Sequence, residues 1–310
     1  MIPFPIRYSD AVLPDASGSW PLPHPYDLVA TTRTLRTGPH DPTSRIASDG
    51  LWRTTHTPEG PVTVRVHVQS DALHADAWGP GAAFALSDLP RWLGLDEPVW
   101  AFAPHPVVDD LARHHRGLRG TDTRDPFDAL VLTVLMQLVT WQHGAMTWRR
   151  LCRTFGERAP GPADLYLPPT PAAIRAAGTW RLESIGIGGK QARTLMEVAR
   201  VPHVVRRVTD MPTTDAMELL QKIKGVGPWT AATVLGDRLG RPDPIPLGDF
   251  HLPNTIAWAL AGEARANDAR MVALLTPFEG QAYRVIRLVL AAGIGAPKFG
   301  PRRRGLRRTA

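Results

Sequence analysis

The residue of this sequence best suited to catalysis is an aspartate at the end of a loop that cannot be helical. Asp249 closes the segment 240–249, which contains three prolines and two glycines, and an apolar stretch that predicts a helix follows it. An aspartate at a helix start most often caps the helix. A carboxylate fixed on so stiff a backbone can also stabilise positive charge that develops on a bound substrate. Taken alone, Asp249 favours the cap, and the choice depends on what precedes it.

A glycine-rich turn lies upstream of Asp249. Residues 219–232 read LLQKIKGVGPWTAA, which predicts a helix, a tight turn through Gly225 and Gly227, and a second helix that begins at Pro228. Such a turn leaves backbone N–H groups facing outward at a helix start, where they bind phosphate. Val226 should fill the apolar space between the two helices. Positive charge beside the turn comes from two lysines, Lys222 and Lys224.

This turn is either a plain connection between helices or a hairpin that grips a DNA backbone. Gly-x-Gly alone does not separate the two interpretations. The longer pattern, an apolar residue followed by Lys-Gly-Val-Gly-Pro-Trp-Thr-Ala, favours the DNA hairpin. A carboxylate held twenty residues after Trp229 would face the nucleotide that the hairpin docks. The two features together therefore favour a catalytic role for Asp249.

A second glycine cluster, residues 186–190, does not fit a nucleotide-binding loop. It lacks the Gly-x4-Gly-Lys-Ser/Thr spacing, and no buried strand precedes it. It predicts a turn at a helix start, with Lys190 and Arg193 near a phosphate. The histidines and the single cysteine show no zinc-binding spacing, and a Gly-x-Ser-x-Gly nucleophile motif is absent.

The elements that must position these residues begin with strands. Valine alternates with polar residues over 62–68, which predicts a half-buried strand. Strand patterns at 51–57 and 73–77, with turn residues between them, extend this to an antiparallel meander. Short helices are expected beside it, near 25–35 and 81–93.

The remainder of the chain predicts helices. Asp125 can cap a helix that has Pro126 in its first turn, and apolar residues from Phe127 to Leu138 follow at helical spacing. Further helices are expected near 143–155, 189–201, 214–222, 228–239, 250–260 and 280–291.

The fold class expected from these elements is α+β. An N-terminal antiparallel β domain with flanking helices would occupy residues 1–117, and an all-helical core would follow over residues 118–296. The boundary is placed in the stretch 116–120, which is rich in glycine and arginine. Residues 297–310 are expected to form a basic, disordered tail.

Composition narrows the class of protein. The 310 residues are enough for two or three domains, and no apolar run approaches the roughly 18 residues of a membrane span. The first residues lack the basic and apolar regions of a signal peptide. Cys152 is the only cysteine, so an internal disulfide or a self-contained iron–sulfur cluster is excluded and a reducing cytoplasm fits best.

Charge is distributed unevenly along the chain. The net charge is +7, and six cationic residues with no acid fall within residues 297–310, so the rest of the chain is near neutral. Such a tail can hold phosphate by counterion release. A tail that only increases solubility fits the composition equally well.

With these motifs in place, the sequence resembles the helix-hairpin-helix-Gly/Pro-Asp superfamily of DNA glycosylases, and more narrowly the DNA-3-methyladenine glycosylase II (AlkA-type) family. Asp249 falls at the position of the family's catalytic aspartate. The other matching segments are Pro25–Asp27, Met136–Val139, Gly225–Ala231 and Pro277–Phe278. The resemblance covers most of the chain, and its hairpin and aspartate motifs are the specific ones.

The resemblance implies a role for each matching residue. Asp249 would be the catalytic carboxylate, and Trp229 and Phe278 would line the base pocket, although Phe278 could equally belong to the core. Leu138, with Gln137 beside it, would be the wedge that fills the gap left by a flipped nucleotide. The alternative for Leu138 is a core position on the 127–138 stripe. The residues expected to bind the DNA backbone are Lys224, Gly225, Val226, Gly227 and Thr230.

The sequence departs from the family pattern at two pocket positions. The second pocket aromatic, four residues after the hairpin tryptophan, is here Thr233, and the aromatic expected from the N-terminal domain is not evident where Thr34 lies. The pocket is therefore expected to be wider or more polar. No metal is expected on side chains and no cofactor is expected, while the resemblance implies a monovalent cation on the hairpin carbonyls.

The expected function is that of a monofunctional DNA glycosylase for alkylated purines such as 3-methyladenine and 7-methylguanine, acting in base excision repair. Glycosylases that also cut the strand carry a lysine where this chain has Trp229, so no lyase activity is expected. The partner would be double-stranded DNA with a damaged base. A monomer without membrane contact is expected in the cytoplasm, at the nucleoid if the source is bacterial. The alternatives are a glycosylase for oxidised or deaminated bases and a non-catalytic DNA-binding protein.

Overall fold

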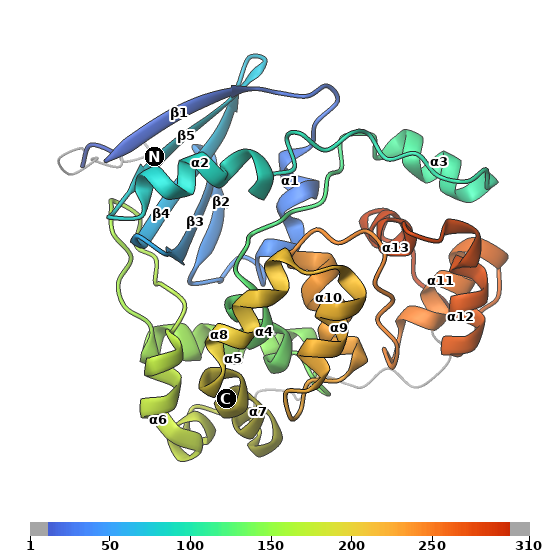
Figure 1. The fold of residues 1–310 in the computed structure, drawn as a ribbon. Coiled ribbons are helices and arrows are strands. Elements are labelled where there is room, and N and C mark those ends of the chain that lie inside the picture. Colours follow the sequence, from blue (N-terminus) through green and yellow to red (C-terminus); the bar gives the residue numbers. More distant parts are fainter. Residues whose placement is uncertain (1–11, 298–310) are drawn as a thin grey trace, which may run out of the picture.

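The computed structural model describes residues 12–297 and begins with a five-stranded antiparallel sheet (Figure 1). The strands are β1 (Ala16–Pro21), β2 (Ser44–Ala47), β3 (Gly50–Thr57), β4 (Gly60–Gln69) and β5 (Ala72–Trp78), in the spatial order β1-β5-β4-β3-β2. The meander expected from the alternating pattern is confirmed as β3, β4 and β5. Val62, Val64 and Val66 are buried, as the alternation predicts, but Val68 is 45% exposed near the end of β4 and Thr63 is buried, so the alternation is wrong at these two positions.

Short helices flank the sheet. α2 (Ala82–Trp92) packs on β1, β4 and β5. A second flanking element consists of α1 (Leu28–Thr31) and the 3-10 helix η1 (Thr32–Leu35). η1 contacts α10, a helix of the second half of the chain, so the N-terminal region reaches the helical core directly.

The rest of the described chain is helical, and the expected helices are found. They are α4 (Pro126–Leu135), α5 (Trp141–Phe155), α7 (Gly189–Arg200), α9 (Thr213–Gln221), α10 (Pro228–Arg238), α11 (Leu252–Ala261) and α13 (Ala282–Ala291). The side chain of Asp125 accepts the N–H of Asp128, which confirms the predicted cap. Helices that the sequence analysis did not identify are α3 (Pro106–His114), α6 (Pro171–Ser184), α8 (Pro202–Arg207) and α12 (Asp268–Leu275), together with the 3-10 helices η2 (Val208–Asp210) and η3 (Thr276–Phe278).

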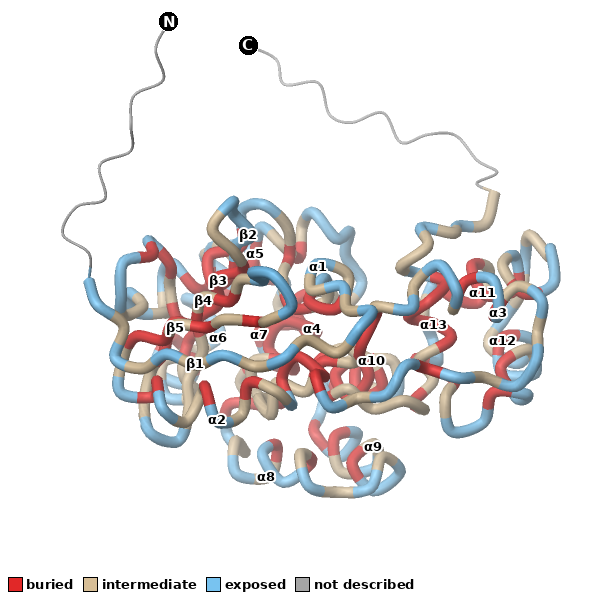
Figure 2. Tube along the Cα trace, turned by 90° about the horizontal axis from the view of Figure 1, so that it is seen from above, coloured by how far each residue is buried: buried red, intermediate tan, exposed pale blue. Residues whose placement is uncertain are grey.

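α4 is the central helix of the larger helical group. Its residues belong both to the cluster shared with α5, α6 and α7 and to the cluster shared with α9 and α10. A helix that is apolar all round is expected to be buried on all sides. Figure 2 shows buried segments of α4 and α10 running through the middle of the molecule.

A second helical group consists of α11, α12, α13 and α3. Val108 and Leu111 of α3 share one core with α11 and α13, so residues 106–114 pack with the last helices of the chain. The stretch 116–120 is packed as well. Arg119 is buried, and its guanidinium donates to the carbonyl oxygens of Arg116, Leu118 and Pro25.

The last two sequence expectations concern the basic tail and membrane-spanning helices. The basic residues 298–310 lie outside the described residues, so the tail expected there stays a prediction. Within residues 12–297, none of the helices combines the length and the apolar character that crossing a membrane requires.

Candidate DNA-binding and catalytic site

The hairpin turn has the geometry that its sequence predicts. α9 and α10 flank it, and Val226 is only 5% exposed within the apolar cluster that the two helices share. Gly225 has a φ of +95°, and a Cβ atom there would collide with the side chain of Thr194 in α7. Gly227 has open space around the position of a Cβ atom. One glycine is therefore required by the fold, and the other leaves the turn open to another molecule.

The turn offers donors to an anion. Val226 uses its N–H within the turn, in a bond to the carbonyl of Ile223. The N–H groups of Gly225 and Gly227 donate to no group within residues 12–297. They lie at the start of α10, where the helix dipole also favours a negative charge. This end of the helix can therefore bind a phosphate of a DNA backbone.

Basic side chains surround the turn. Lys222 and Lys224 are exposed beside it. Residues 186–190 lead into α7, as the sequence predicts, and α7 brings the exposed Lys190 and Arg193 to the same region because Thr194 lies against Gly225. The hairpin thus lies in a positively charged part of the surface.

Gln137 connects the hairpin to the turn between α4 and α5. Its amide donates to the carbonyl of Gly225 at 3.0 Å and to the hydroxyl of Thr230 at 2.8 Å. Thr230 is buried, so its hydroxyl serves this internal contact. The monovalent cation expected on the hairpin carbonyls stays a prediction, and it would have to share the oxygen of Gly225 with Gln137.

Leu138 is on the surface. α4 ends at Leu135, and Leu138 follows in a turn with a φ of +58° and 88% of its surface exposed. The helical spacing expected to run from 127 to 138 is therefore wrong beyond Leu135, and the core alternative for Leu138 is wrong as well. The exposed position is the one that an apolar wedge requires.

Gln191, which the sequence analysis did not single out, fixes the end of α4. It is buried at the start of α7, and its amide donates to the carbonyls of Leu135 and Gln137 at 3.0 Å each. Its side-chain oxygen accepts the N–H of Gly188. These bonds replace the continued helix and hold the turn that presents Leu138. In the sequence, the local signal for this role is a glutamine three residues after a glycine at a helix start.

Asp249 binds the start of α11 from two residues before the N-cap residue, His251, and it also faces the hairpin helix. Its Oδ1 accepts the N–H groups of His251 and Leu252 at 2.7 Å, at the start of α11. Its Oδ2 accepts the indole N–H of Trp229 at 2.8 Å. The two interpretations of this residue are therefore compatible, because one carboxylate oxygen anchors the side chain and the other lies beside α10.

The loop that carries Asp249 is tied to the second helical group, which itself packs against α10. The carboxylate of Asp268 accepts the N–H of Gly248, and the carbonyl of Pro242 accepts the N–H of Tyr283 in α13. The ring of Tyr283 lies so close to Gly236 of α10 that a Cβ atom would not fit. The carboxylate is therefore placed by contacts on each side of it rather than by its own loop alone.

Charges behind the loop are buried. Burial raises the pKa of Tyr283 well above its ordinary value, and the nearby carboxylates of Asp237 and Asp249 raise it further. The pKa of Asp237 is also raised, mainly by burial, although Arg287 and a hydrogen bond with Tyr283 oppose this. Tyr283 thus remains a neutral hydrogen-bonding group behind the loop that carries Asp249.

Two threonines lie where the family pattern has pocket aromatics. Thr233 is half-buried on α10, one turn after Trp229 and on the same side of the helix. Thr34 lies a further turn along, where its hydroxyl donates to the carbonyl of Asp237 at 3.0 Å. Threonine side chains therefore stand along the helix face that continues from Trp229.

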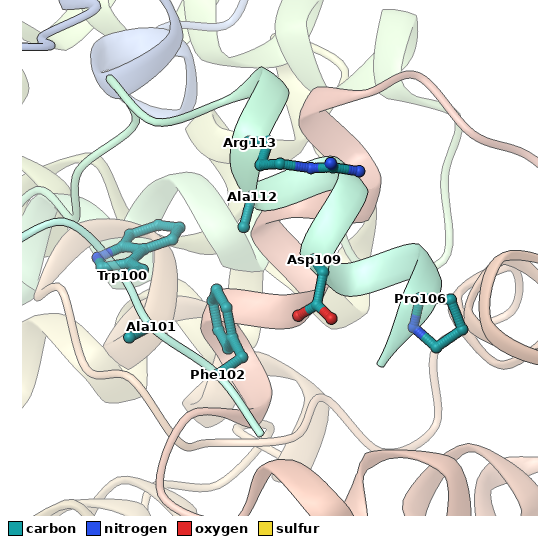
Figure 3. A pocket seen from close by; sticks show the side chains of 7 residues that line it. All are labelled: Trp100, Ala101, Phe102, Pro106, Asp109, Ala112 and Arg113. Carbon is teal, nitrogen blue, oxygen red and sulfur yellow. The ribbon is translucent and has the colours of Figure 1, made fainter. Parts of the chain in front are cut away.

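Phe278 is only 3% exposed and packs edge to face on Phe102 and His105, with ring centroids 6.3 Å and 5.9 Å away. This placement favours the core alternative for Phe278. An open pocket of about 550 Å³ lies beside Phe102 and is lined by the residues labelled in Figure 3. None of the predicted site residues lines that pocket.

Groups of metal-binding side chains are not found near the site. Across residues 12–297, no three side chains of histidine, cysteine, aspartate or glutamate come together as a metal ion would require. The chemistry that the arrangement offers is electrostatic. It places a carboxylate beside an indole ring and next to an open anion-binding turn.

Comparisons with known proteins agree with this arrangement. No family model matches the sequence. The chain is 31% identical over 117 residues to DNA-3-methyladenine glycosylase 2 of Escherichia coli, matching 37% of this chain and 42% of the relative. It is 29% identical over 176 residues to a DNA-3-methyladenine glycosylase of Bacillus subtilis, matching 54% and 58%. The chain thus spans about half the length of the curated relatives it matches.

Solved structures share the fold over a larger part of the chain. A 3-methyladenine DNA glycosylase from Archaeoglobus fulgidus aligns with a TM-score of 0.74 and 18% identity, covering 88% of this chain and 97% of the other. An 8-oxoguanine glycosylase/lyase from Clostridium acetobutylicum, solved with double-stranded DNA, aligns with a TM-score of 0.68 and 12% identity, covering 86% and 91%. At these identities the likeness concerns the fold.

Proposed function

We infer that this chain, which belongs to the helix-hairpin-helix superfamily of DNA glycosylases, is a monofunctional enzyme that releases alkylated purines from double-stranded DNA. The observation that carries the proposal is the contact between Asp249 and Trp229. It places a carboxylate and an electron-rich aromatic ring together, beside a turn that can hold the DNA backbone. A non-catalytic DNA-binding protein has no use for a carboxylate turned towards anionic DNA.

The reaction begins with the removal of the damaged nucleotide from the base stack. A base inside the duplex cannot reach Asp249, so the nucleotide must be flipped out, at a cost of about a few kcal/mol. The amides of Gly225 and Gly227 hold the backbone, and Leu138 fills the gap in the stack. Gln137 joins these two parts, so that backbone binding and wedge insertion occur together.

Cleavage of the N-glycosidic bond then builds positive charge on the sugar, as in other glycoside hydrolyses, and a water molecule adds to C1′ and loses a proton, which leaves the free base and an abasic sugar. The carboxylate of Asp249 stabilises this oxocarbenium character electrostatically. Alkylation at N3 or N7 makes the purine cationic and a good leaving group, so a strong general acid is not needed. The indole of Trp229 favours a cationic base by cation–π attraction, worth roughly 0.5–2 kcal/mol.

Trp229 also supports the absence of lyase activity. A glycosylase that cuts the strand needs an amine to form a Schiff base with the sugar. The indole of Trp229 occupies the position of that lysine, and its only N–H is bound to Asp249. The product is therefore an abasic site in an unbroken strand.

The proposal is tested by measuring base release from methylated duplex DNA. We expect free 3-methyladenine or 7-methylguanine by chromatography, and strand breaks only after treatment with alkali. Parallel duplexes with uracil or 8-oxoguanine test the other lesion classes. Release from those duplexes alone would assign a different substrate, and strand breaks without alkali would contradict the monofunctional mechanism. Tight DNA binding without any release would indicate a binding protein.

Replacing Leu138 with alanine is expected to slow release from duplex DNA about tenfold, because the gap left by the flipped nucleotide is no longer filled. Release from a single strand of the same sequence should be nearly unchanged, since that strand has no stack to hold open. The measurement is the ratio of single-turnover rates on the two substrates. Because Leu138 is 88% exposed, the thermal stability should not change. Equal losses on both substrates would contradict the wedge role.

A further inference from the structure

A second large apolar side chain is exposed close to Leu138. Trp141 is the first residue of α5 and 56% exposed, and Val139 between them is 36% exposed. Single exposed apolar residues are ordinary on protein surfaces, whereas a group of them marks a contact surface. We call Leu138, Val139 and Trp141 the wedge patch. The mechanism above uses only its first member.

The wedge patch is held in a fixed position. Thr140 caps α5 by accepting the N–H of His143. Gly144 lies so close to Leu135 and Met136 that a Cβ atom there would collide with the sulfur of Met136. The start of α5 is therefore pressed against the end of α4, and Gln137 ties the same turn to the hairpin. The start of α5 and the hairpin are therefore held in a fixed relation to each other.

The charge of α5 fits a nucleic-acid strand. The helix contains no acidic residue, and its arginines, Arg149, Arg150 and Arg153, lie in its second half, at least eight positions after Trp141. Its N-terminus, which carries the positive end of the helix dipole, lies at the wedge patch.

We propose that Trp141 stacks on the base of the undamaged strand that loses its partner when the damaged nucleotide is flipped out. Leu138 occupies the place of the flipped base, and Trp141 follows three residues later at the start of α5. Among the large exposed aromatic side chains of residues 12–297, Trp141 is the nearest to Leu138 along the chain. Stacking on an aromatic ring accepts any base, because every base has a π face. This inference rests on the proposed function only for the flipping step and not for the kind of lesion.

The inference is tested by DNA binding without catalysis. The probes are duplexes in which a tetrahydrofuran abasic analogue faces either adenine or a second tetrahydrofuran. Trp141→Ala is expected to weaken binding to the adenine duplex about tenfold, which corresponds to about 1.4 kcal/mol. Trp141→Phe should retain most of the affinity. On the duplex that lacks both bases, Trp141→Ala should bind like the wild type, because no base is there to stack.

Trp180 supplies a matched control. It is 77% exposed on α6, so Trp180→Ala removes an equally large exposed indole elsewhere, and no change in affinity is expected. Wild-type affinity of Trp141→Ala for the adenine duplex would overturn the proposal, as would an equal loss on both duplexes. A wild-type protein that does not prefer the abasic duplex to intact DNA would instead contradict the proposed function.

Discussion

Asp249→Asn is expected to lower the single-turnover rate of base release by about 10²–10³-fold while the protein remains folded and binds DNA. The amide has no charge with which to stabilise a cationic sugar. Its oxygen can still accept the N–H groups of His251 and Leu252, so the cap of α11 is preserved. The hydrogen bond from Trp229 is lost in that orientation, at a cost of about 1 kcal/mol of folding free energy. Rates are measured on methylated duplex DNA, and unfolding is followed by heat.

Asp268→Asn is the matched control for this experiment. It removes the same charge beside the same loop, since Asp268 binds the N–H of Gly248. Its amide oxygen can keep that bond, so we expect a loss in rate of less than about tenfold. Similar losses in the two variants would mean that the loop geometry or the general negative potential matters, and that Asp249 does not act on the sugar.

Gly225→Ala is expected to lower the free energy of unfolding by about 2–4 kcal/mol and to abolish tight DNA binding. Its φ of +95° strains any residue with a side chain, and the new methyl group would collide with Thr194. Relief of the collision must move the hairpin away from α7, which disturbs the turn that binds phosphate. The measurements are urea unfolding and fluorescence anisotropy with labelled duplex DNA at fixed salt, because salt alone changes such affinities.

Gly227→Ala separates folding from binding in the same turn. The added methyl group meets no protein atom and the φ of this residue is −98°, so the free energy of unfolding should change by less than about 0.5 kcal/mol. The methyl group stands where a phosphate would approach, and we expect about a tenfold loss of DNA affinity. Unchanged affinity would show that the turn does not contact the backbone.

Local features of the sequence predicted those parts of the protein that local physics determines. The alternating valines of β4, the cap at Asp125 and the plug at Val226 each depend on residues a few positions apart. The start of α11 shortly after Asp249 is of the same kind. Such patterns involve only neighbouring residues, so a short segment of sequence is enough to recognise them.

The end of α4 could not be predicted in this way. The apolar spacing continues to Leu138, but the helix stops at Leu135 because Gln191, more than fifty residues later, takes the carbonyls that end it. A wedge on the surface and a leucine in the core have the same local sequence. Only the contact with α7 distinguishes them.

The local sequence also does not decide whether Phe278 lies in a pocket or in the core. Its proline-aromatic context is compatible with a pocket wall, whereas the structure covers it with Phe102 and His105. Those residues belong to the segment before α3, for which the sequence patterns predict no helix or strand. A side chain cannot be assigned to a pocket or a core before the segment that covers it is known.

The bonds of Gln137 and Gln191 also bear on how this protein would travel along intact DNA. Gln137 joins the turn that carries Leu138 to the hairpin, and Gln191 joins the same turn to α7, so turn and hairpin approach and leave the duplex as one body. Inserting Leu138 at a base pair then requires the hairpin to hold the backbone. Moving to the next pair requires both the hairpin and Leu138 to leave the DNA. The strength of the phosphate contact would therefore bear on how long the protein stays at each base pair.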